Sequence, residues 1–303
     1  MKYSLIIPHF NDVERLDRLL CTVSIDRPDV EVIVVDDCSP DQSAIEEVTA
    51  RWPRVRWLST PENAGAGVAR NVGMGATQGC WLVFADSDDK FLPGAFDTFD
   101  LVLRADDEMV YFLVEAVQKA DDSQSVRSER MNDLVTAYAM SSNEGALERL
   151  RLQHVVPWAK GYSSAFIKGH EVRFDPIRRS NDVAFNVLAA VQAGRLRADV
   201  TSVYRIYRRA QSQTADVSAT AFVKRFLADR SVAQRLAAPS ARGVRSVTGT
   251  MLLSVRCGPR VALQVWLVAI CATMQIVWAR IFDLKRWRRF VTNQPSYAQE
   301  QSK

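Results

Sequence analysis

The chain has 303 residues, of which 48% are hydrophobic and 24% are charged. This balance is typical of a globular protein and excludes a disordered, collagen-like or disulfide-scaffold chain. The charge is unevenly spread, with 9 Lys and Arg against 17 Asp and Glu in residues 1–100, but 17 against 4 in residues 201–303. The pattern predicts a cation-handling site near the start of the chain and an anionic partner for its end.

Two features indicate the compartment. The five cysteines are scattered and form no CxxC pair, which is typical of reduced thiols and of a chain without a cysteine metal site. The apolar run after Met1 is interrupted at Pro8, too early for a signal peptide. We therefore expect a cytoplasmic protein.

The first hundred residues alternate between two hydrophobic periods. Strands are predicted at 3–7, 30–35, 55–58 and 81–85, and helices after Asn11, at 43–51, at 64–77 and from Pro93. This alternation predicts an α/β fold, a doubly wound and mostly parallel sheet with its ligand at the carboxyl ends of the strands. From 101 to 212 the pattern is less regular, with one strand at 109–114 and a polar loop at 119–130, and beyond Thr214 the chain becomes helical and basic.

Acidic residues follow two of the predicted strands, so they should converge at one edge of the sheet. Asp86, Asp88 and Asp89 follow the fourth strand, and their oxygens suit a hard divalent ion such as Mg²⁺ or Mn²⁺. A solvated turn or a helix cap is the alternative. Asp36 and Asp37 follow the second strand, either as an Asx-type turn that caps the next helix or as acceptors for a nucleoside.

The segment 63–71 (NAGAGVARN) predicts a helix start with spaced glycines and a basic residue one turn later. Close helix packing is one interpretation of the glycines. The other is a helix N-terminus, with Arg70, that faces a phosphate. The segment is neither a Walker loop nor a GxGxxG turn.

Taken together, these motifs resemble the family 2 glycosyltransferases, whose fold is the Rossmann-like GT-A fold. The matching blocks are 4–11 (SLIIPHFN), 34–39 (VVDDCS), 63–73 (NAGAGVARNVG), 76–79 (ATQG), 84–89 (FADSDD) and Pro93. A thinner likeness continues through 157–160 (PWAK), Phe174, 180–185 (SNDVAF), Tyr204 and Arg205. The resemblance covers about the first two thirds of the chain.

The resemblance implies roles for individual residues. Asp37 would bind the nucleobase, with main chain around Pro8 and Phe10, while Asp86 would contact the ribose and Asp88 would hold the metal. The nucleotide-binding residues expected in all are Pro8, Phe10, Asn11, Asp37, Asn63, Arg70, Asp86 and Lys160, the last as a positive charge near the phosphates.

Asp182 would be the general base that takes a proton from the acceptor hydroxyl. The family has a Glu-Asp pair at this place, whereas this chain has Asn181 and Asp182. The alternative is that Asp182 serves only as the N-cap of a helix at 183–193.

The resemblance implies three segments: a nucleotide-sugar-binding half (1–100), an acceptor-binding half (101–212) and a helical basic extension (213–303). It also implies an inverting hexosyl- or N-acetylhexosaminyltransferase that uses a divalent metal and a nucleotide sugar, with a preference for UDP. The acceptor would be a glycan or a lipid-linked oligosaccharide in surface polysaccharide synthesis. A sugar nucleotidyltransferase and an inactive nucleotide-sugar-binding module are the alternatives.

The basic extension contains a run of 19 uncharged residues, 261–279, with arginine and lysine on both sides. Gln264 and Gln275 fall on one narrow stripe of a helix, which favours a helix lying in the interface of an anionic membrane over one that spans it. A helix packed on the protein is the alternative. We expect attachment to the inner face of the plasma membrane and no nucleic-acid partner.

Overall fold

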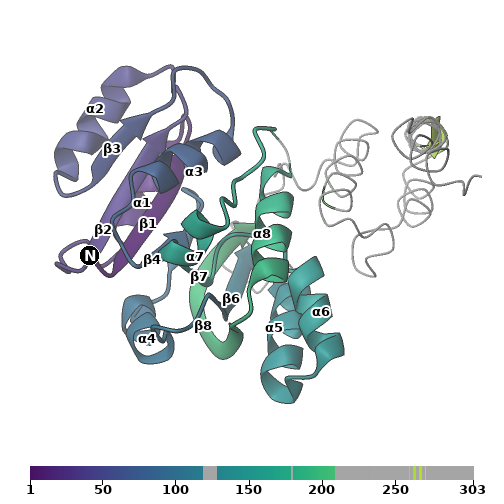
Figure 1. Ribbon diagram of the computed structural model, residues 1–303. Coiled ribbons are helices and arrows are strands. Elements are labelled where there is room, and N and C mark those ends of the chain that lie inside the picture. Colours follow the sequence, from purple (N-terminus) through teal and green to yellow (C-terminus); the bar gives the residue numbers. More distant parts are fainter. Residues whose placement is uncertain are drawn as a thin grey trace, which may run out of the picture. The chain divides into compact units, whose positions relative to one another are not determined.

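The structure is a computed structural model that describes residues 1–118, 128–178 and 180–208, with isolated positions beyond them. The chain divides into two compact units. The first contains residues 1–216 and 224–245, and the second contains 217–223 and 246–303. The fold below is that of the first unit (Figure 1).

One eight-stranded sheet runs through this unit in the order β3-β2-β1-β4-β7-β6-β8-β5. Its first half is parallel: β1 (Tyr3–His9) pairs with both β2 (Val30–Asp36) and β4 (Trp81–Phe84), and β3 (Arg56–Ser59) pairs with β2. Because these strands are parallel, their carboxyl ends meet at one edge.

The second half of the sheet is mixed. Strand β7 (Lys160–Ser163) is antiparallel to β4 and to β6 (Met109–Gln118), whereas β8 (Leu196–Arg208) is parallel to β6. The two-residue strand β5 (Lys90–Phe91) pairs antiparallel with β8. Strand β8 therefore lies beside the loop that joins β4 to β5.

Helices cover both faces of the sheet. Helices α1 (Val13–Leu20) and α4 (Ala95–Val102) pack on the face that carries Leu5 and Ile7. The face that carries Ile6 and Phe84 is covered by α3 (Ala66–Gly75), α5 (Glu129–Ser141), α7 (Ser164–Gly169) and α8 (Asn181–Gln192). Helix α2 (Gln42–Arg51) contacts α1, and α6 (Glu144–Gln153) packs on α5 and α8 (Figure 1).

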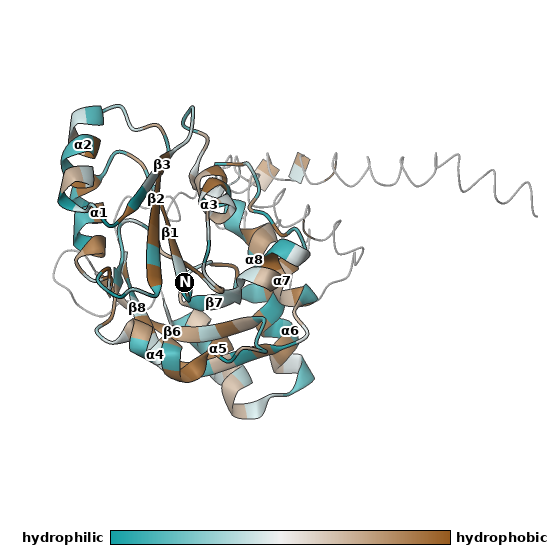
Figure 2. Cartoon of the chain, turned by 60° about the vertical axis from the view of Figure 1, so that its left-hand side comes forward, coloured by the Kyte–Doolittle hydropathy of each residue, from teal (hydrophilic) through white to brown (hydrophobic). Residues whose placement is uncertain are grey.

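Successive side chains of β1 lie on opposite faces of the sheet, which explains why helices must cover both faces. The side chains of β1 are buried on both sides, and it is mostly apolar, without the alternation of apolar and polar residues that marks a strand with one exposed face. Figure 2 shows β1 and β2 largely hydrophobic between helices that are hydrophilic on their outer sides. This is the burial pattern that the sequence predicted.

All the strands and helices expected in the first hundred residues are present, with small changes at their ends. The helix expected from Pro93 begins two residues later, at Ala95, because Gly94 adopts a left-handed conformation (φ 76°) as its N-cap. The strand expected at 109–114 extends to Gln118. The expected loop at 119–130 falls largely outside the described residues, as does nearly all of the basic extension.

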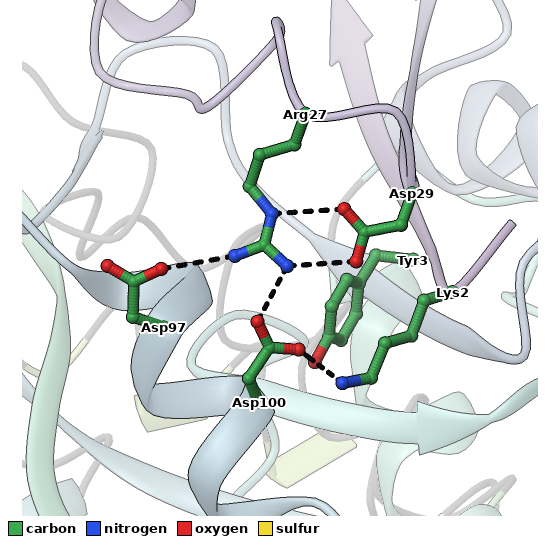
Figure 3. Close-up of polar contacts among 6 residues, drawn as sticks. All are labelled: Lys2, Tyr3, Arg27, Asp29, Asp97 and Asp100. Atoms are coloured by element: carbon green, nitrogen blue, oxygen red, sulfur yellow. Dashed lines mark hydrogen bonds and ion pairs between the residues drawn. The ribbon is translucent and has the colours of Figure 1, made fainter.

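A group of charges joins the amino ends of β1 and β2 to α4 (Figure 3). Arg27 donates to Asp29, Asp97 and Asp100. Asp100 also accepts from Lys2 and from the hydroxyl of Tyr3, the latter at 2.9 Å. These contacts hold the pKa of Asp100 at about 2 although burial opposes this. We call these six residues the Arg27 network.

Candidate active site

Three carboxylates gather in the loop between β4 and β5. One oxygen from each of Asp86, Asp88 and Asp89 lies within 4.8 Å of the others. Strand β8 holds the loop from the side: the Tyr204 hydroxyl accepts from the Asp86 N–H at 2.9 Å, and the Tyr207 N–H donates to Asp89 at 2.9 Å. The shape of this loop is therefore set by residues more than a hundred positions later in the chain.

This carboxylate cluster fits a hard divalent cation. Its oxygens are of the kind that Mg²⁺ and Mn²⁺ prefer, and like charges at this spacing repel one another unless a cation lies among them. With Asp88 as the expected ligand, an ion bound here would neutralise the charge that develops on a diphosphate leaving group.

Asp37, at the end of β2, is only 3% exposed and organises the loop that follows β3. Its carboxylate accepts from the Thr60 hydroxyl at 2.8 Å, from the Ala64 N–H at 3.0 Å and from the Gly65 N–H at 2.7 Å. These internal donors occupy much of its capacity as an acceptor. Contact between Asp37 and a nucleobase stays a prediction, and it must use the remaining lone pairs.

The turn after β1 is tied to the turn after β2 through Ser39. Asp36 accepts from the Ser39 N–H at 2.9 Å and from its hydroxyl at 2.5 Å, and the same hydroxyl accepts from the Asn11 N–H at 2.8 Å. Asp36 thus has the structural role of an Asx-type turn, while the cap of α2 is Asp41 instead. Between the two acidic sites, Pro8 is buried in β1 and Phe10 is 45% exposed in the following turn.

Arg70 joins the carboxylate cluster to the start of α8. One guanidinium nitrogen donates to Asp86 at 2.5 Å and the other donates to Asn181 at 3.1 Å. The guanidinium also lies over the ring of Phe174, 5.3 Å from its centre. A phosphate contact for Arg70 stays a prediction, but the structure shows that it already bridges two segments 95 residues apart in sequence.

The rest of the 63–71 motif holds the segment that leads into α8. Asn71 exchanges two hydrogen bonds with the backbone of Phe174, at 2.9 and 3.0 Å, and the Asn63 carbonyl accepts from Arg178 at 2.7 Å. A Cβ on Gly67 would lie 2.5 Å from the Asp175 carbonyl oxygen, so only glycine fits there. The close-packing interpretation of these glycines is confirmed for Gly67.

Asp182 lies in the first turn of α8, beside this bridge. The N-cap of α8 is Ser180, so the interpretation of Asp182 as an N-cap is wrong. Burial raises the pKa of Asp182, an effect that Arg70 opposes and Asp86 reinforces. A carboxylate with a raised pKa is a better proton acceptor near neutral pH, as a general base requires.

The side chain of Lys160 does not lie where a residue that contacts the nucleotide phosphates would lie. Its side chain is fully buried, and its amine donates to the His154 carbonyl at 2.9 Å and to the Asn186 side chain at 2.7 Å. An amine enclosed in this way presents no surface to a phosphate. The expectation of a direct nucleotide contact for Lys160 therefore does not fit the structure, because the side chain of a β7 residue points into the protein here.

Several residues of the site were missed because no local pattern marks them. Tyr207 acts through its backbone, and Thr60 through one hydroxyl. Asn186 is buried in the middle of an apolar helical segment, and an amide at such a position is the one signal that sequence alone could have used. The sequence motif had already placed Asn71, but not its bonds to Phe174.

Comparison with known proteins supports this picture. The model of the family described as "Glycosyl transferase family 2" matches residues 4–168. The succinoglycan biosynthesis protein ExoO of Rhizobium meliloti is 28% identical over 243 residues, which cover 74% of this chain and 68% of that protein. TarS of Staphylococcus aureus, a poly(ribitol-phosphate) β-N-acetylglucosaminyltransferase, is 25% identical over 65% of this chain and 34% of its own length.

Solved structures show the same fold. Residues 1–349 of Staphylococcus aureus TarS, in complex with UDP-GlcNAc, superpose with a TM-score of 0.56 at 21% identity, covering 77% of this chain and 67% of that chain. A mannosyltransferase from Pyrobaculum calidifontis, in complex with GDP-Man and Mn²⁺, gives 0.52 at 14% identity, covering 94% and 82%. The fold is thus the GT-A fold, and the chain belongs to glycosyl transferase family 2.

Proposed function

We propose that this protein transfers a sugar, with inversion, from a UDP-sugar to a hydroxyl of a glycan or lipid-linked oligosaccharide during surface polysaccharide synthesis. The observation that carries the proposal is the Arg70 bridge between Asp86, in the carboxylate cluster, and Asn181, next to Asp182. It supports the proposal because it links the loop with the expected metal ligands to the turn that carries the expected base.

Each part has a separate task in this proposal. Asp88, with Asp86 and Asp89, would hold a divalent ion against the diphosphate of the donor. Asp182 would take the proton from the acceptor hydroxyl, which its raised pKa favours. A single in-line displacement then inverts the anomeric centre, and alignment of donor and acceptor supplies much of the rate.

The relatives favour a polysaccharide pathway and a UDP donor. ExoO is named for succinoglycan biosynthesis, and TarS for β-N-acetylglucosaminyl transfer to poly(ribitol phosphate). TarS was crystallised with UDP-GlcNAc, which makes an N-acetylhexosamine donor the first to test. The family match speaks against a sugar nucleotidyltransferase, and retention of the acidic residues speaks against an inactive module.

The test starts with a panel of nucleotide sugars, each mixed with the full chain and Mn²⁺ or Mg²⁺. We expect metal-dependent donor hydrolysis and thermal stabilisation with one UDP-sugar. Asp182→Asn keeps the shape of the side chain but removes the base, so turnover should fall on the order of 10²- to 10⁴-fold with nearly unchanged donor affinity. A wild-type rate in this variant, or full activity in excess chelator, contradicts the proposal.

We also propose peripheral attachment to an anionic membrane through the basic extension. Of its described residues, Leu263, Trp266, Leu267 and Ile270 are helical, exposed and spaced as one helix face. Basic residues flank this face on both sides, a composition suited to anionic lipid. Among the described residues, the structure contains no helix long and apolar enough to cross a membrane.

Liposome flotation tests this attachment. The full chain should bind vesicles of anionic lipid, should be released by high salt, and should ignore neutral vesicles. Leu267→Glu should weaken binding, because it puts a charge in the apolar face, whereas Leu101→Glu, at an exposed position of α4, should not. Equal binding by all three proteins would contradict the proposal.

A further inference from the structure

The buried amine of Lys160 has no part in the function proposed so far, although the surroundings of this amine are built for a cation. Its three protons meet three acceptors: the His154 carbonyl at 2.9 Å, the Asn186 oxygen at 2.7 Å, and the face of the Tyr111 ring, whose centre is 4.5 Å away. Each of these groups stabilises a proton donor and none offers a proton. The geometry therefore fits the charged ammonium.

Burying the charged amine of Lys160 costs free energy, so a lysine at this position calls for an explanation. Lys160, Tyr111, Tyr162 and Asn186 are all fully buried. Burial pushes the pKa of Lys160 well below its ordinary value, and the field of Asp182 opposes that fall. The neighbouring His154 has its pKa lowered by burial and by Lys160, so the histidine is neutral beside the ammonium. A methionine would fill the same space without this cost.

Asn186 connects the amine of Lys160 to the backbone of the proposed base, Asp182. Its oxygen accepts from Lys160 and from the Tyr162 hydroxyl, both at 2.7 Å. Its NH₂ group donates to the carbonyl oxygens of Val155 at 3.0 Å and Asp182 at 2.8 Å. All four hydrogen-bonding positions of the amide are matched, so a flipped amide would face two donors with its own NH₂ group.

The first turn of α8 thus lies between two cations. On one side, Arg70 binds Asn181, and on the other, Lys160 reaches the Asp182 carbonyl through Asn186. Among the charged groups that act on the Asp182 carboxylate, Arg70 and Lys160 favour its ionised form and Asp86 opposes it.

We propose that Lys160 is a positioning residue for sugar transfer: through Asn186 it fixes the turn that carries Asp182, and its buried charge keeps that carboxylate ready to accept a proton. The inference rests on the proposed role of Asp182 as the base. It gives Lys160 an effect on catalysis without any contact to the donor or the acceptor.

The test compares Lys160→Met with Lys168→Met in the full chain. Lys168 is exposed on α7, where its amine donates to the Thr77 carbonyl at 3.2 Å, so the second variant makes the same chemical change away from the site. We expect Lys160→Met to lower kcat about 10- to 100-fold with the donor KM within about 2-fold, because the base is misplaced while donor contacts remain. Lys168→Met should keep wild-type values.

The pH profile separates positioning from a general loss of structure. Asp182 must be ionised to act, and removal of a nearby cation raises its pKa, so the acid limb of kcat should move to higher pH. A merely structural defect would lower kcat and leave the limb in place. A folded Lys160→Met variant whose acid limb does not move overturns the proposal.

The variant Asn186→Asp tests the same proposal if Lys160→Met does not fold. It keeps the acceptor for Lys160 and Tyr162, but loses both donated bonds and neutralises the lysine charge. The same fall in kcat and the same shift of the acid limb are expected, and wild-type behaviour overturns the inference. Should Asp182→Asn be fully active, the proposed function has failed instead, since no base is then left for Lys160 to position.

Discussion

The two ends of the parallel strands use acidic residues in opposite ways. At the amino ends, the Arg27 network sets two cations, Lys2 and Arg27, among three carboxylates and one tyrosine hydroxyl (Figure 3). At the carboxyl ends, one oxygen from each of three carboxylates lies within 4.8 Å of the others, and Arg70 contacts one of these groups, Asp86. One end sets its carboxylates directly against cations of the fold, whereas the other gathers three carboxylates whose oxygens are close enough to share one cation.

We expect the carboxylates at the amino ends to stabilise the fold and those at the carboxyl ends to bind a cation. A carboxylate that is paired in the folded protein has a lowered pKa, as Asp100 does at about 2, and its removal costs stability. Carboxylates crowded together repel one another, and a bound cation relieves that repulsion. Four predictions test this contrast.

The largest effect is expected at Asp88. Asp88→Asn should lower sugar transfer by about 10³-fold or more, because the expected metal ligand is lost while the side chain keeps its size. Without metal, its free energy of unfolding should fall by less than that of Asp100→Asn, because the loss of one of three like charges relieves repulsion within the cluster. Activity assays and chemical denaturation check both parts. A marked loss of stability with little loss of activity would reverse the contrast.

The next effect concerns the packing that joins the two halves of the site. Gly67→Ala should destabilise the protein by about 1–3 kcal/mol and lower kcat, because the new methyl group would lie 2.5 Å from the Asp175 carbonyl oxygen. Gly75→Ala, in the same helix and with no atom within 4 Å of the added methyl group, should be neutral or slightly stabilising. Equal denaturation midpoints for these two variants would contradict the packing argument.

A smaller effect is expected in the Arg27 network. Asp100→Asn should cost about 1–2 kcal/mol of stability, because Arg27, Lys2 and Tyr3 all donate to this carboxylate. Asp97→Asn is the matched control: its carboxylate also contacts Arg27, but its side chain is 79% exposed, so the loss should be below about 0.5 kcal/mol. Neither variant should change kcat. A loss of activity at constant stability in Asp100→Asn would show that the two ends are not independent.

The smallest effect is the pH dependence that Asp100 contributes. Its pKa is lower in the folded protein than the ordinary value of 3.8, so the stabilisation is complete above about pH 4 and is lost as the pH falls toward 2. After solvent screening, this amounts to about 1 kcal/mol. Acid denaturation of the wild type and of Asp100→Asn should therefore converge at low pH, and a constant gap between the two curves would contradict the assignment.

The sequence by itself determined the sheet and the position of the acids along it. The β-branched run in 30–35 predicts a strand buried on both faces. Parallel strands then bring Asp36 and Asp86 to the same edge of the sheet. The likeness to family 2 glycosyltransferases rested on these same local blocks, which is why the fold and the family could be predicted correctly.

Only the tertiary structure decided which groups touch. Arg70 reaches Asn181 across 111 residues, and Tyr204 and Tyr207 hold the carboxylate loop across 118. Lys160 shows most clearly what the sequence does not determine. Its neighbours in sequence suggested a phosphate contact, but the pairing of β7 with β6 turns its amine into the protein interior. Hydrophobic period and local spacing report secondary structure, whereas burial and long-range partners depend on how the elements pack.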